Sequence, residues 1–279
     1  MKKMFAALIA AGMCVCVSAF AFDVMEYIPL KGAVKNYTRI DYGITSKFGE
    51  YFRTPEMKIV RVFDRAGREI ESSEMTGRGT LVNKIKNTYD ASGKLTAQEG
   101  YNADNALIWK SAVTYGAAGN KVDESEYGKD GGLKNKTIYT YTGSLLTDES
   151  YYGAGGELVW KIVYAYDDAG RLSVECRYYA DGSLDEEIDY AYTDGGKIDA
   201  ITFIDGTGAV QKRSYFRYGS DGVLNEITTS DAEGKTIARE IYKYDTAGNI
   251  ARISSYAVAK KFGTTVTELV GMSELTYEY

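Results

Sequence analysis

Acidic side chains are the groups in this sequence with the clearest chemical potential. Asp167-Asp168 and Asp185-Glu186-Glu187 place carboxylates side by side, and a glycosidase needs two carboxyl groups that face one pocket across a defined gap. Here the acids recur with an internal repeat and mark no single location. The chain has no histidine, which excludes Ser-His-Asp and Cys-His arrangements and histidine-bearing metal sites. We therefore predict no catalytic residue, no enzyme activity and no cofactor.

Two further candidates have simpler structural interpretations. Asp181, Asp194 and Asp221 could hold calcium, but aspartate also stabilises hairpin turns by bonding to the backbone, and no ligand cage surrounds them in the sequence. We predict no metal site. Cys176 is expected on an apolar face opposite Ile162, which favours a buried thiol over a nucleophile. No glycine-rich nucleotide-binding motif is present, so we expect no nucleotide ligand.

Aromatic side chains are the candidates for binding. The chain has 25 tyrosines beside 30 glycines, and a row of rings on a sheet can stack on sugars or on a peptide. The same rings also stabilise a sheet through cross-strand packing. The candidate ligand-binding aromatics are Trp109, Trp160, Tyr115, Tyr141, Tyr166, Tyr192, Tyr218 and Tyr244.

These rings belong to a repeat in which an aromatic or apolar residue is followed by glycine four places on and, usually, by an aliphatic residue six places on. Tyr166, Gly170 and Leu172 show it in full, and successive starts alternate steps of 12 and 14 residues, which makes a unit of 26. The spacing predicts three-residue hairpin loops that end in the left-handed region, where glycine costs least and asparagine is next best. A shortened copy predicts a two-residue Gly143-Ser144 turn. The positions expected in the left-handed slot are Gly93, Gly131, Gly170, Gly182, Gly196, Gly222 and Asn105.

The even steps predict which residues share a face of the sheet. Side chains alternate with a period of two, so an even step returns each aromatic residue to the same face. The expected cross-strand pairs are Tyr166 with Leu172, Tyr164 with Val174, Ile162 with Cys176, and Trp160 with Tyr178. The other face is more polar, although isoleucines and a phenylalanine also fall on it (Ile201, Phe203, Ile227, Ile237, Ile241), and Glu186, Lys212 and Glu240 fall on the apolar face.

The repeat predicts an all-β fold: a long antiparallel β-meander of about 16 short strands built from 26-residue hairpin repeats. A round barrel with this number of strands would leave a lumen too wide for side chains to fill. We therefore expect a twisted or curled ribbon with its tyrosine face turned inward. Residues 59–256 form the repeats, residues 22–58 an N-terminal cap, and residues 257–279 one or more C-terminal capping strands.

The first 21 residues indicate export. Lys2 and Lys3 precede an apolar run (residues 4–17), and Ala19-Phe20-Ala21 supplies a small-x-small cleavage pattern, as in a secretory signal peptide cut near Ala21. A membrane anchor or a lipoprotein site within the run are the alternatives. Cleavage would leave a net charge of 31 − 39 = −8. A mildly acidic chain with scattered charges is a poor nucleic-acid binder, so we expect no nucleic-acid partner.

The segments Tyr164-Ala-Tyr-Asp-Asp-Ala-Gly-Arg-Leu172, Tyr242-Lys-Tyr-Asp-Thr-Ala-Gly-Asn-Ile250 and Thr88-Tyr-Asp-Ala-Ser-Gly-Lys-Leu95 resemble YD repeats of the Rhs type. Weaker copies extend the resemblance over about residues 59–256. It implies a ribbon of β-hairpins that spirals into a shell; some members of that family act at cell surfaces or have been proposed to bind carbohydrate. We expect no toxin domain, because only 23 residues follow Tyr256. The turn pattern also resembles, less closely, the repeats of MORN-like modules.

Two classes of function lead. The first is a non-enzymatic exported scaffold or binding module in the periplasm, at the outer surface or secreted, which presents an extended β-surface to a protein or carbohydrate of the cell envelope or host surface. The alternative is an outer-membrane β-barrel, supported by the export signal, an even number of strands and the final aromatic residue, Tyr279. Short turns on both edges and charges on the candidate lipid face (Glu186, Lys212, Glu226, Glu240) oppose it. A glycan-active enzyme is a third class.

Overall fold

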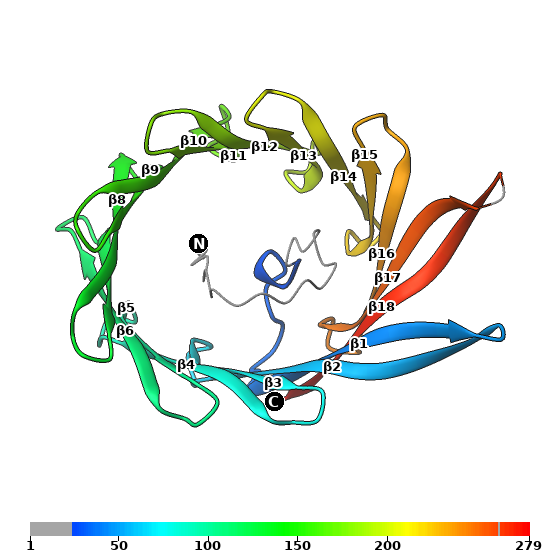
Figure 1. Cartoon of the computed structure of the whole chain (residues 1–279), viewed down its shortest axis with the longest axis horizontal. Helices are drawn as coiled ribbons and strands as arrows, with labels where there is room; N and C mark the ends of the chain where they lie inside the picture. Colours follow the sequence, from blue (N-terminus) through cyan, green and yellow to red (C-terminus); the bar gives the residue numbers. More distant parts are fainter. Residues whose placement is uncertain (1–23, 262) are drawn as a thin grey trace.

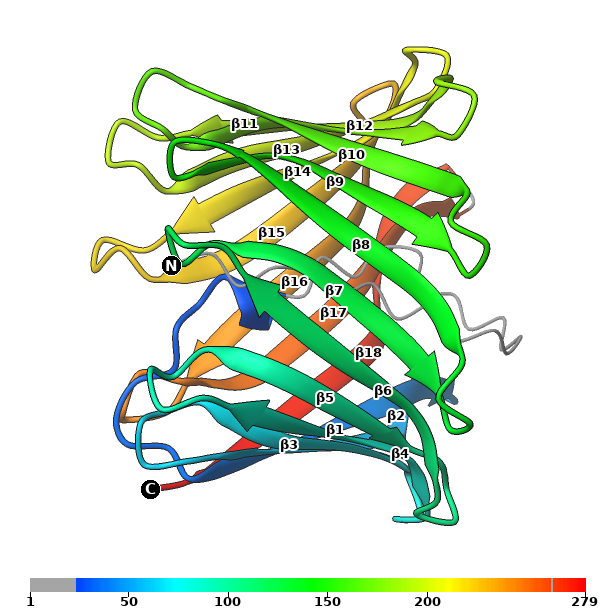
Figure 2. The same ribbon diagram turned by 90° about the vertical axis from the view of Figure 1, so that its left-hand side faces the viewer.

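One closed β-sheet forms the wall of the molecule. The computed structural model describes residues 24–261 and 263–279, so the expected signal peptide and its cleavage site lie outside the described residues. Within the described residues, eighteen strands each pair antiparallel with the next along the chain, and the last also pairs with the first. The result is a ring of tilted strands around a lumen (Figures 1 and 2).

The elements follow one another without crossovers. A short 3₁₀ helix, η1 (Val24–Glu26), precedes the strands β1 (Asn36–Lys47), β2 (Glu50–Phe63), β3 (Glu69–Thr76), β4 (Leu81–Tyr89), β5 (Leu95–Tyr101), β6 (Leu107–Tyr115), β7 (Lys121–Gly128), β8 (Leu133–Thr142), β9 (Leu145–Gly153), β10 (Leu158–Tyr166), β11 (Leu172–Tyr179), β12 (Leu184–Tyr192), β13 (Ile198–Asp205), β14 (Val210–Tyr218), β15 (Leu224–Asp231), β16 (Thr236–Tyr244), β17 (Ile250–Lys261) and β18 (Thr264–Glu278).

Closure corrects the expectation of an open ribbon. The all-β, antiparallel character is confirmed, but the sheet is a barrel, because β1 pairs with β18 from Asn36↔Glu278 to Gly43↔Gly271. Residues 22–58 and 257–279, expected to cap two separate ends, supply the strands that meet at this seam. An open sheet of this length would leave two rows of unpaired backbone groups, and closure removes both.

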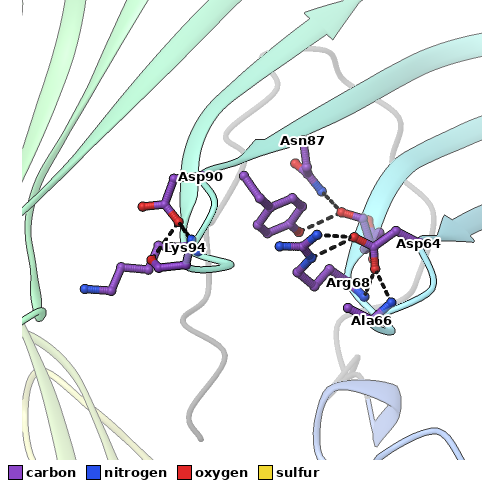
Figure 3. A network of polar contacts seen from close by, with 9 residues as sticks. Asp64, Ala66, Arg68, Asn87, Asp90 and Lys94 are labelled. Carbon is purple, nitrogen blue, oxygen red and sulfur yellow. Dashed lines mark hydrogen bonds and ion pairs between the residues drawn. The ribbon is translucent and has the colours of Figure 1, made fainter.

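The predicted turns are confirmed. Each expected glycine slot has a positive φ: Gly93 (86°), Gly131 (83°), Gly170 (73°), Gly182 (84°), Gly196 (78°), Gly222 (76°) and Asn105 (59°). The Gly143-Ser144 turn pairs Thr142 with Leu145 as expected. In most loops an Asp or Asn side chain accepts backbone N–H bonds. Asp64, for example, accepts bonds from Ala66 and Arg68, and Asp90 from Lys94 (Figure 3).

The predicted strand register is wrong beyond the first pair after each three-residue loop, whereas the two-residue turn keeps both expected pairs, Thr142 with Leu145 and Tyr141 with Leu146. Tyr166 does pair with Leu172, but a β-bulge follows, so Ala165 pairs with Val174 and Tyr164 with Glu175. The other two expected pairs fail in the same way, because Ile162 faces Arg177 and Trp160 faces Tyr179. An extra residue in one strand shifts all later pairs by one position and reverses their faces.

A bulge occurs at the start of almost every strand, so even steps along the sequence do not return aromatics to one face. Tyr101, for example, lies twelve residues after Tyr89 and was expected on the same face. It pairs instead with Lys84, on the face opposite to Trp109. The same shift explains two of the isoleucines that seemed misplaced in the sequence, Ile201 and Ile227, whereas Ile241 stays on the outer face, paired with Glu226. Ile201 pairs with Tyr190, and Ile227 pairs with Phe216.

One face of the sheet points into the lumen. Residues 24–34 enter the ring (Figure 1) and pack on side chains of the later strands. The core cluster joins Val24 and Val34 of this segment to Tyr37, Phe63, Ile201, Phe216, Leu224, Ile227, Tyr242, Ile250, Ile253 and Leu275. The face that carries Ile201, Phe216 and Tyr242 is therefore the inner face, and the strand pairings extend this assignment around the whole wall.

Candidate functional site

The lumen is the part of the fold where chemically varied side chains converge. In β6, the inward residues Trp109, Ser111 and Val113 are buried, whereas the outward residues between them are exposed. The strand pairings place all eight predicted binding aromatics on the inner face. The sequence therefore identified lumen-facing residues, although for a ribbon rather than for a barrel.

Two inner positions of the repeat change in chemistry around the ring. The first is occupied by Arg61, Asn87, Val113, Tyr139, Tyr164, Tyr190, Phe216 and Tyr242. The second is occupied by Ser72, Gln98, Glu124, Glu149, Glu175, Ile201, Ile227 and Ile253. The wall thus has a polar sector (β2–β5), an acidic and tyrosine-rich sector (β7–β12) and an apolar sector (β13–β17).

The N-terminal segment covers the apolar sector. Val24 is 3% exposed and joins the cluster around Phe216 and Leu224. Asn249, which is 2% exposed, fixes the segment at the rim: its Oδ1 accepts a bond from the Lys31 N–H (2.7 Å), and its Nδ2 donates to the Lys31 carbonyl (2.9 Å). The acidic, tyrosine-rich sector is outside this cluster, apart from Ile188 and Tyr190, which pack against it. We define the candidate site as that sector.

Glu149 lies at the centre of the candidate site. It sits on β9 opposite Tyr139 of β8, and the Tyr164 hydroxyl of β10 donates to its Oε1 at 3.0 Å. On the next strand pair, Tyr164 faces Glu175. On the opposite side of Glu149, beyond β8, Lys121 of β7 forms an ion pair with Glu124 of the same strand (2.5 Å). Tyrosines and glutamates therefore alternate across β7–β11 in one row.

Burial controls the charge of this row. Glu149 is 6% exposed. Burial raises its pKa to about 7, against the opposing effects of the Tyr164 hydroxyl and the Lys121 charge. Burial, together with the nearby charge of Glu186, also raises the pKa of Glu175. Burial raises the pKa values of Tyr139, Tyr164 and Tyr190 as well, so these rings stay neutral hydroxyl donors at neutral pH.

Two tryptophan sites flank the row. Trp160 stacks on Tyr151 of the neighbouring strand, with ring centroids 4.8 Å apart and planes 3° from parallel. Trp109 lies against Gly100, where an added Cβ would approach the indole to 2.1 Å. Gly100 therefore makes room for the flat packing of this ring.

The other predicted aromatics stand at one rim of the barrel, and most have a structural partner. Each of five hydroxyls donates to a main-chain carbonyl twenty residues earlier: Tyr115 to Leu95, Tyr166 to Leu146, Tyr192 to Leu172, Tyr218 to Ile198 and Tyr244 to Leu224. Tyr141 belongs to the same row, between Tyr115 and Tyr166. These bonds tie neighbouring hairpins together; ligand binding by the row stays a prediction.

The remaining sequence candidates lie elsewhere. Asp167 accepts a hydrogen bond from the backbone N–H of Arg171 and forms an ion pair with the Arg171 side chain. Asp181 accepts a hydrogen bond from the backbone N–H of Ser183. Cys176 does not face Ile162, because the bulge places it opposite Val163 on the outer face, where it is half-buried beside Glu187. Among residues 24–261 and 263–279, no cluster of three or more His, Cys, Asp or Glu residues could hold a metal.

The outer face carries a ring of charges at mid-strand. One outward repeat position on the even-numbered strands is occupied by Lys58, Lys84, Lys110, Lys136, Lys161, Glu187, Arg213 and Arg239. Several of these charges pair across strands, including Lys110 with Glu99 (2.7 Å) and Lys161 with Asp148 (3.4 Å). Glu186, Lys212 and Glu240, expected on a lipid-facing surface, face the lumen instead. No helix within residues 24–261 and 263–279 is long and apolar enough to cross a membrane.

The fold is similar to that of a porin-like protein from Bacteroides uniformis ATCC 8492. The TM-score is 0.50 at 11% sequence identity, over 89% of this chain and 99% of that one. A more distant likeness, with a TM-score of 0.30 and 14% identity, joins 76% of this chain to 16% of a chain in the TcdB2-TccC3-Cdc42 complex. No protein-family model and no curated protein matches the chain.

The likeness to the porin-like protein shows the fold alone, and the closed barrel agrees better with the barrel alternative than with an open scaffold. Sequence reasoning missed Glu149 and Glu175, because the expected register placed Glu175 on the polar face. A comparison of residues 26 apart would have paired Glu149 with Glu175 and then with Ile201, and so revealed the change of chemistry around the ring.

Proposed function

We propose that this protein is an exported β-barrel that binds a carbohydrate of the cell envelope inside its lumen, with its outer wall in water. The observation that carries the proposal is the division of side chains between the two faces. The inner face holds the tryptophans, the tyrosine–glutamate row and buried carboxyls, whereas charges circle the outer face.

The charged ring is the main argument for an outer wall in water. Lys58, Lys84, Lys110, Lys136, Lys161, Arg213 and Arg239 would lie near the midplane of a bilayer that surrounded the barrel. Each Arg or Lys there costs about 2–4 kcal/mol, so the seven together would cost about 14–28 kcal/mol. That equals or exceeds the stability of a typical folded domain, which is about 5–15 kcal/mol.

A carbohydrate fits the chemistry of the inner face. Aromatic rings such as those of the Trp160–Tyr151 stack offer flat apolar surfaces, and carboxyl, amide and phenol groups beside them can bond to hydroxyls. Gln98 and Asn87 contribute amides from the adjoining polar sector.

Binding is tested with purified protein from residue 22 onward on a glycan array, followed by titration of the best glycan. Trp160→Ala is expected to weaken binding, because it removes the stacked inner ring. The matched control is Tyr215→Ala, which removes an exposed ring from the outer wall (42% exposed). An array without any bound glycan, or equal loss of binding in both variants, would refute the proposal.

An outer-membrane pore is the second candidate, and the likeness to a porin-like protein over most of both chains favours it. Carbonate extraction of cell envelopes separates the two: a barrel with its outer wall in water is released, and a membrane-spanning barrel is retained. Membership of the YD-repeat family remains part of the proposal, supported by the repeat segments and the hairpin architecture.

A further inference from the structure

Two hairpins leave the wall of the barrel. The pairing of β1 with β18 ends at Gly43↔Gly271, and beyond this point the β1–β2 and β17–β18 hairpins separate and project from the same side of the ring (Figure 1). β2 pairs with β3 only from Met57 onward, and β16 pairs with β17 only up to Ala257. Residues 44–56 (the first arm) and residues 258–261 and 263–270 (the second arm) are therefore two-stranded ribbons outside the wall.

The first arm carries aromatic side chains that are exposed in the described chain. All residues from 45 to 57 are exposed. Phe48 is 105% exposed at the tip, and Tyr51 and Phe52 beside it are 56% and 50% exposed. An isolated two-stranded hairpin is only marginally stable in water, so an arm of this kind gains stability from a surface that accepts its tip.

The backbone at the tip adds to the argument. Phe48 has a φ of +55°, in the left-handed region that favours glycine. An L-residue there costs free energy, and a phenylalanine that makes no packing contact does not recover that cost within the fold. The exposed position of the Phe48 ring therefore lowers the stability of the isolated protein.

We propose that the arms dock the barrel on the surface of a lipid bilayer that contains anionic lipids. Phenylalanine and tyrosine at a hairpin tip suit the headgroup level of a bilayer, where aromatic rings gather. Exposed cations lie near both tips, namely Lys47 on the first arm and Lys260 and Lys261 on the second, where Lys261 also pairs with Glu268 (2.7 Å). On the first arm Glu50 and Glu56 balance Lys47 and Arg53, so the excess of positive charge lies on the second arm. Insertion stops at this level, because the wall behind the arms carries the charged ring. This inference does not rest on the lumen ligand.

The test is flotation with vesicles of phosphatidylcholine that contain one-quarter phosphatidylglycerol, at low salt, with the chain from residue 22 onward. We expect the protein to float with these vesicles and to bind pure phosphatidylcholine more weakly. The triple variant Phe48→Gly, Tyr51→Thr and Phe52→Thr is expected to bind about tenfold more weakly, because it removes the aromatic tip. Glycine suits the φ at position 48, so this variant is expected to fold. Tyr215→Thr, a change to an exposed ring on the wall, should bind as the wild type does.

A second measurement reports the depth of the tip. In a Phe48→Trp variant, the emission of the introduced indole is obtained by subtracting the wild-type signal of Trp109 and Trp160. This emission should shift to the blue with vesicles and be quenched by lipids brominated near the headgroup. Three results would overturn the proposal: a wild-type protein that stays with the unbound fraction, a triple variant that floats equally well, or a dimer in sedimentation that the triple variant abolishes. The last would assign the tip to a second copy of the chain.

Discussion

The protonation of Glu149 gives the sharpest test of the inner wall. Burial raises its pKa from 4.5 to about 7, a difference of about 2.5, and each pH unit of such a difference corresponds to about 1.4 kcal/mol between the two protonation states. The charged form of Glu149 should therefore reduce the free energy of unfolding by about 3 kcal/mol. Glu149→Gln removes this charge but keeps an oxygen that can accept the Tyr164 hydroxyl bond.

The direction in which the free energy of unfolding changes with pH follows from where Glu149 binds its proton more tightly. The folded state holds the Glu149 proton more tightly than the unfolded state, so the stability from this group is complete below pH 4.5 and is lost as the pH rises to about 7. In urea unfolding, Glu149→Gln should match the wild type near pH 4.5 and exceed its stability by up to about 3 kcal/mol at pH 8. The difference between the two proteins isolates Glu149 from the other acids.

The control is Glu99→Gln on the outer face. Hydrogen bonds from Lys110 and Tyr101 lower the pKa of Glu99, so its titration lies below the tested range. The stability difference between this variant and the wild type should stay constant from pH 5 to 8. If the Glu149→Gln difference were equally flat, or if that variant were the less stable protein at pH 8, the assignment of a buried, protonated carboxyl to the lumen would be wrong.

Three further changes test how the wall and the inner segment hold together. Asn249→Ala removes both bonds to Lys31 and should cost about 1–3 kcal/mol in urea unfolding, with faster tryptic cleavage at Lys31; unchanged cleavage would contradict the anchoring role. Tyr218→Phe deletes one rim bond and should cost about 1 kcal/mol, which a change below experimental error would refute. Gly100→Ala places a Cβ 2.1 Å from the indole of Trp109 and should cost about 1–3 kcal/mol and shift tryptophan emission; an unaltered spectrum would show that the ring does not depend on this glycine.

Local features of the fold were predictable because they depend on a few adjacent residues. A glycine four places after an aromatic fixes a loop with a left-handed residue, and Gly170 and Gly196 confirm it. Closure was not predictable from the repeat, because the seam is formed by strands outside it. Tyr37 pairs with Tyr277, so the contact joins positions at opposite ends of the chain. No local residue spacing predicts such a contact.

The faces were the hardest feature to predict, because one inserted residue reverses them. A bulge between Ala165 and Tyr166 moves Glu175 beside Tyr164 and turns Cys176 outward. On β11, counting residues from the turn assigns the correct face only to Leu172, the first paired residue. The mixture of isoleucine with acids on the expected polar face was the available sign that the register was shifted.

The bulges also explain why one repeat can build two different surfaces. Each strand presents an inward position that varies from glutamate to isoleucine around the ring, and an outward position that stays charged on every second strand. Structural demands explain the constant outward charges and the rim tyrosines, because both recur wherever a hairpin must be joined to the next. They do not require Glu149 and Glu175 to be buried among neutral phenols, since Ile201 and Ile227 fill the same repeat position at a lower desolvation cost. The departure from isoleucine at these two positions therefore supports the proposal that the lumen binds a polar ligand.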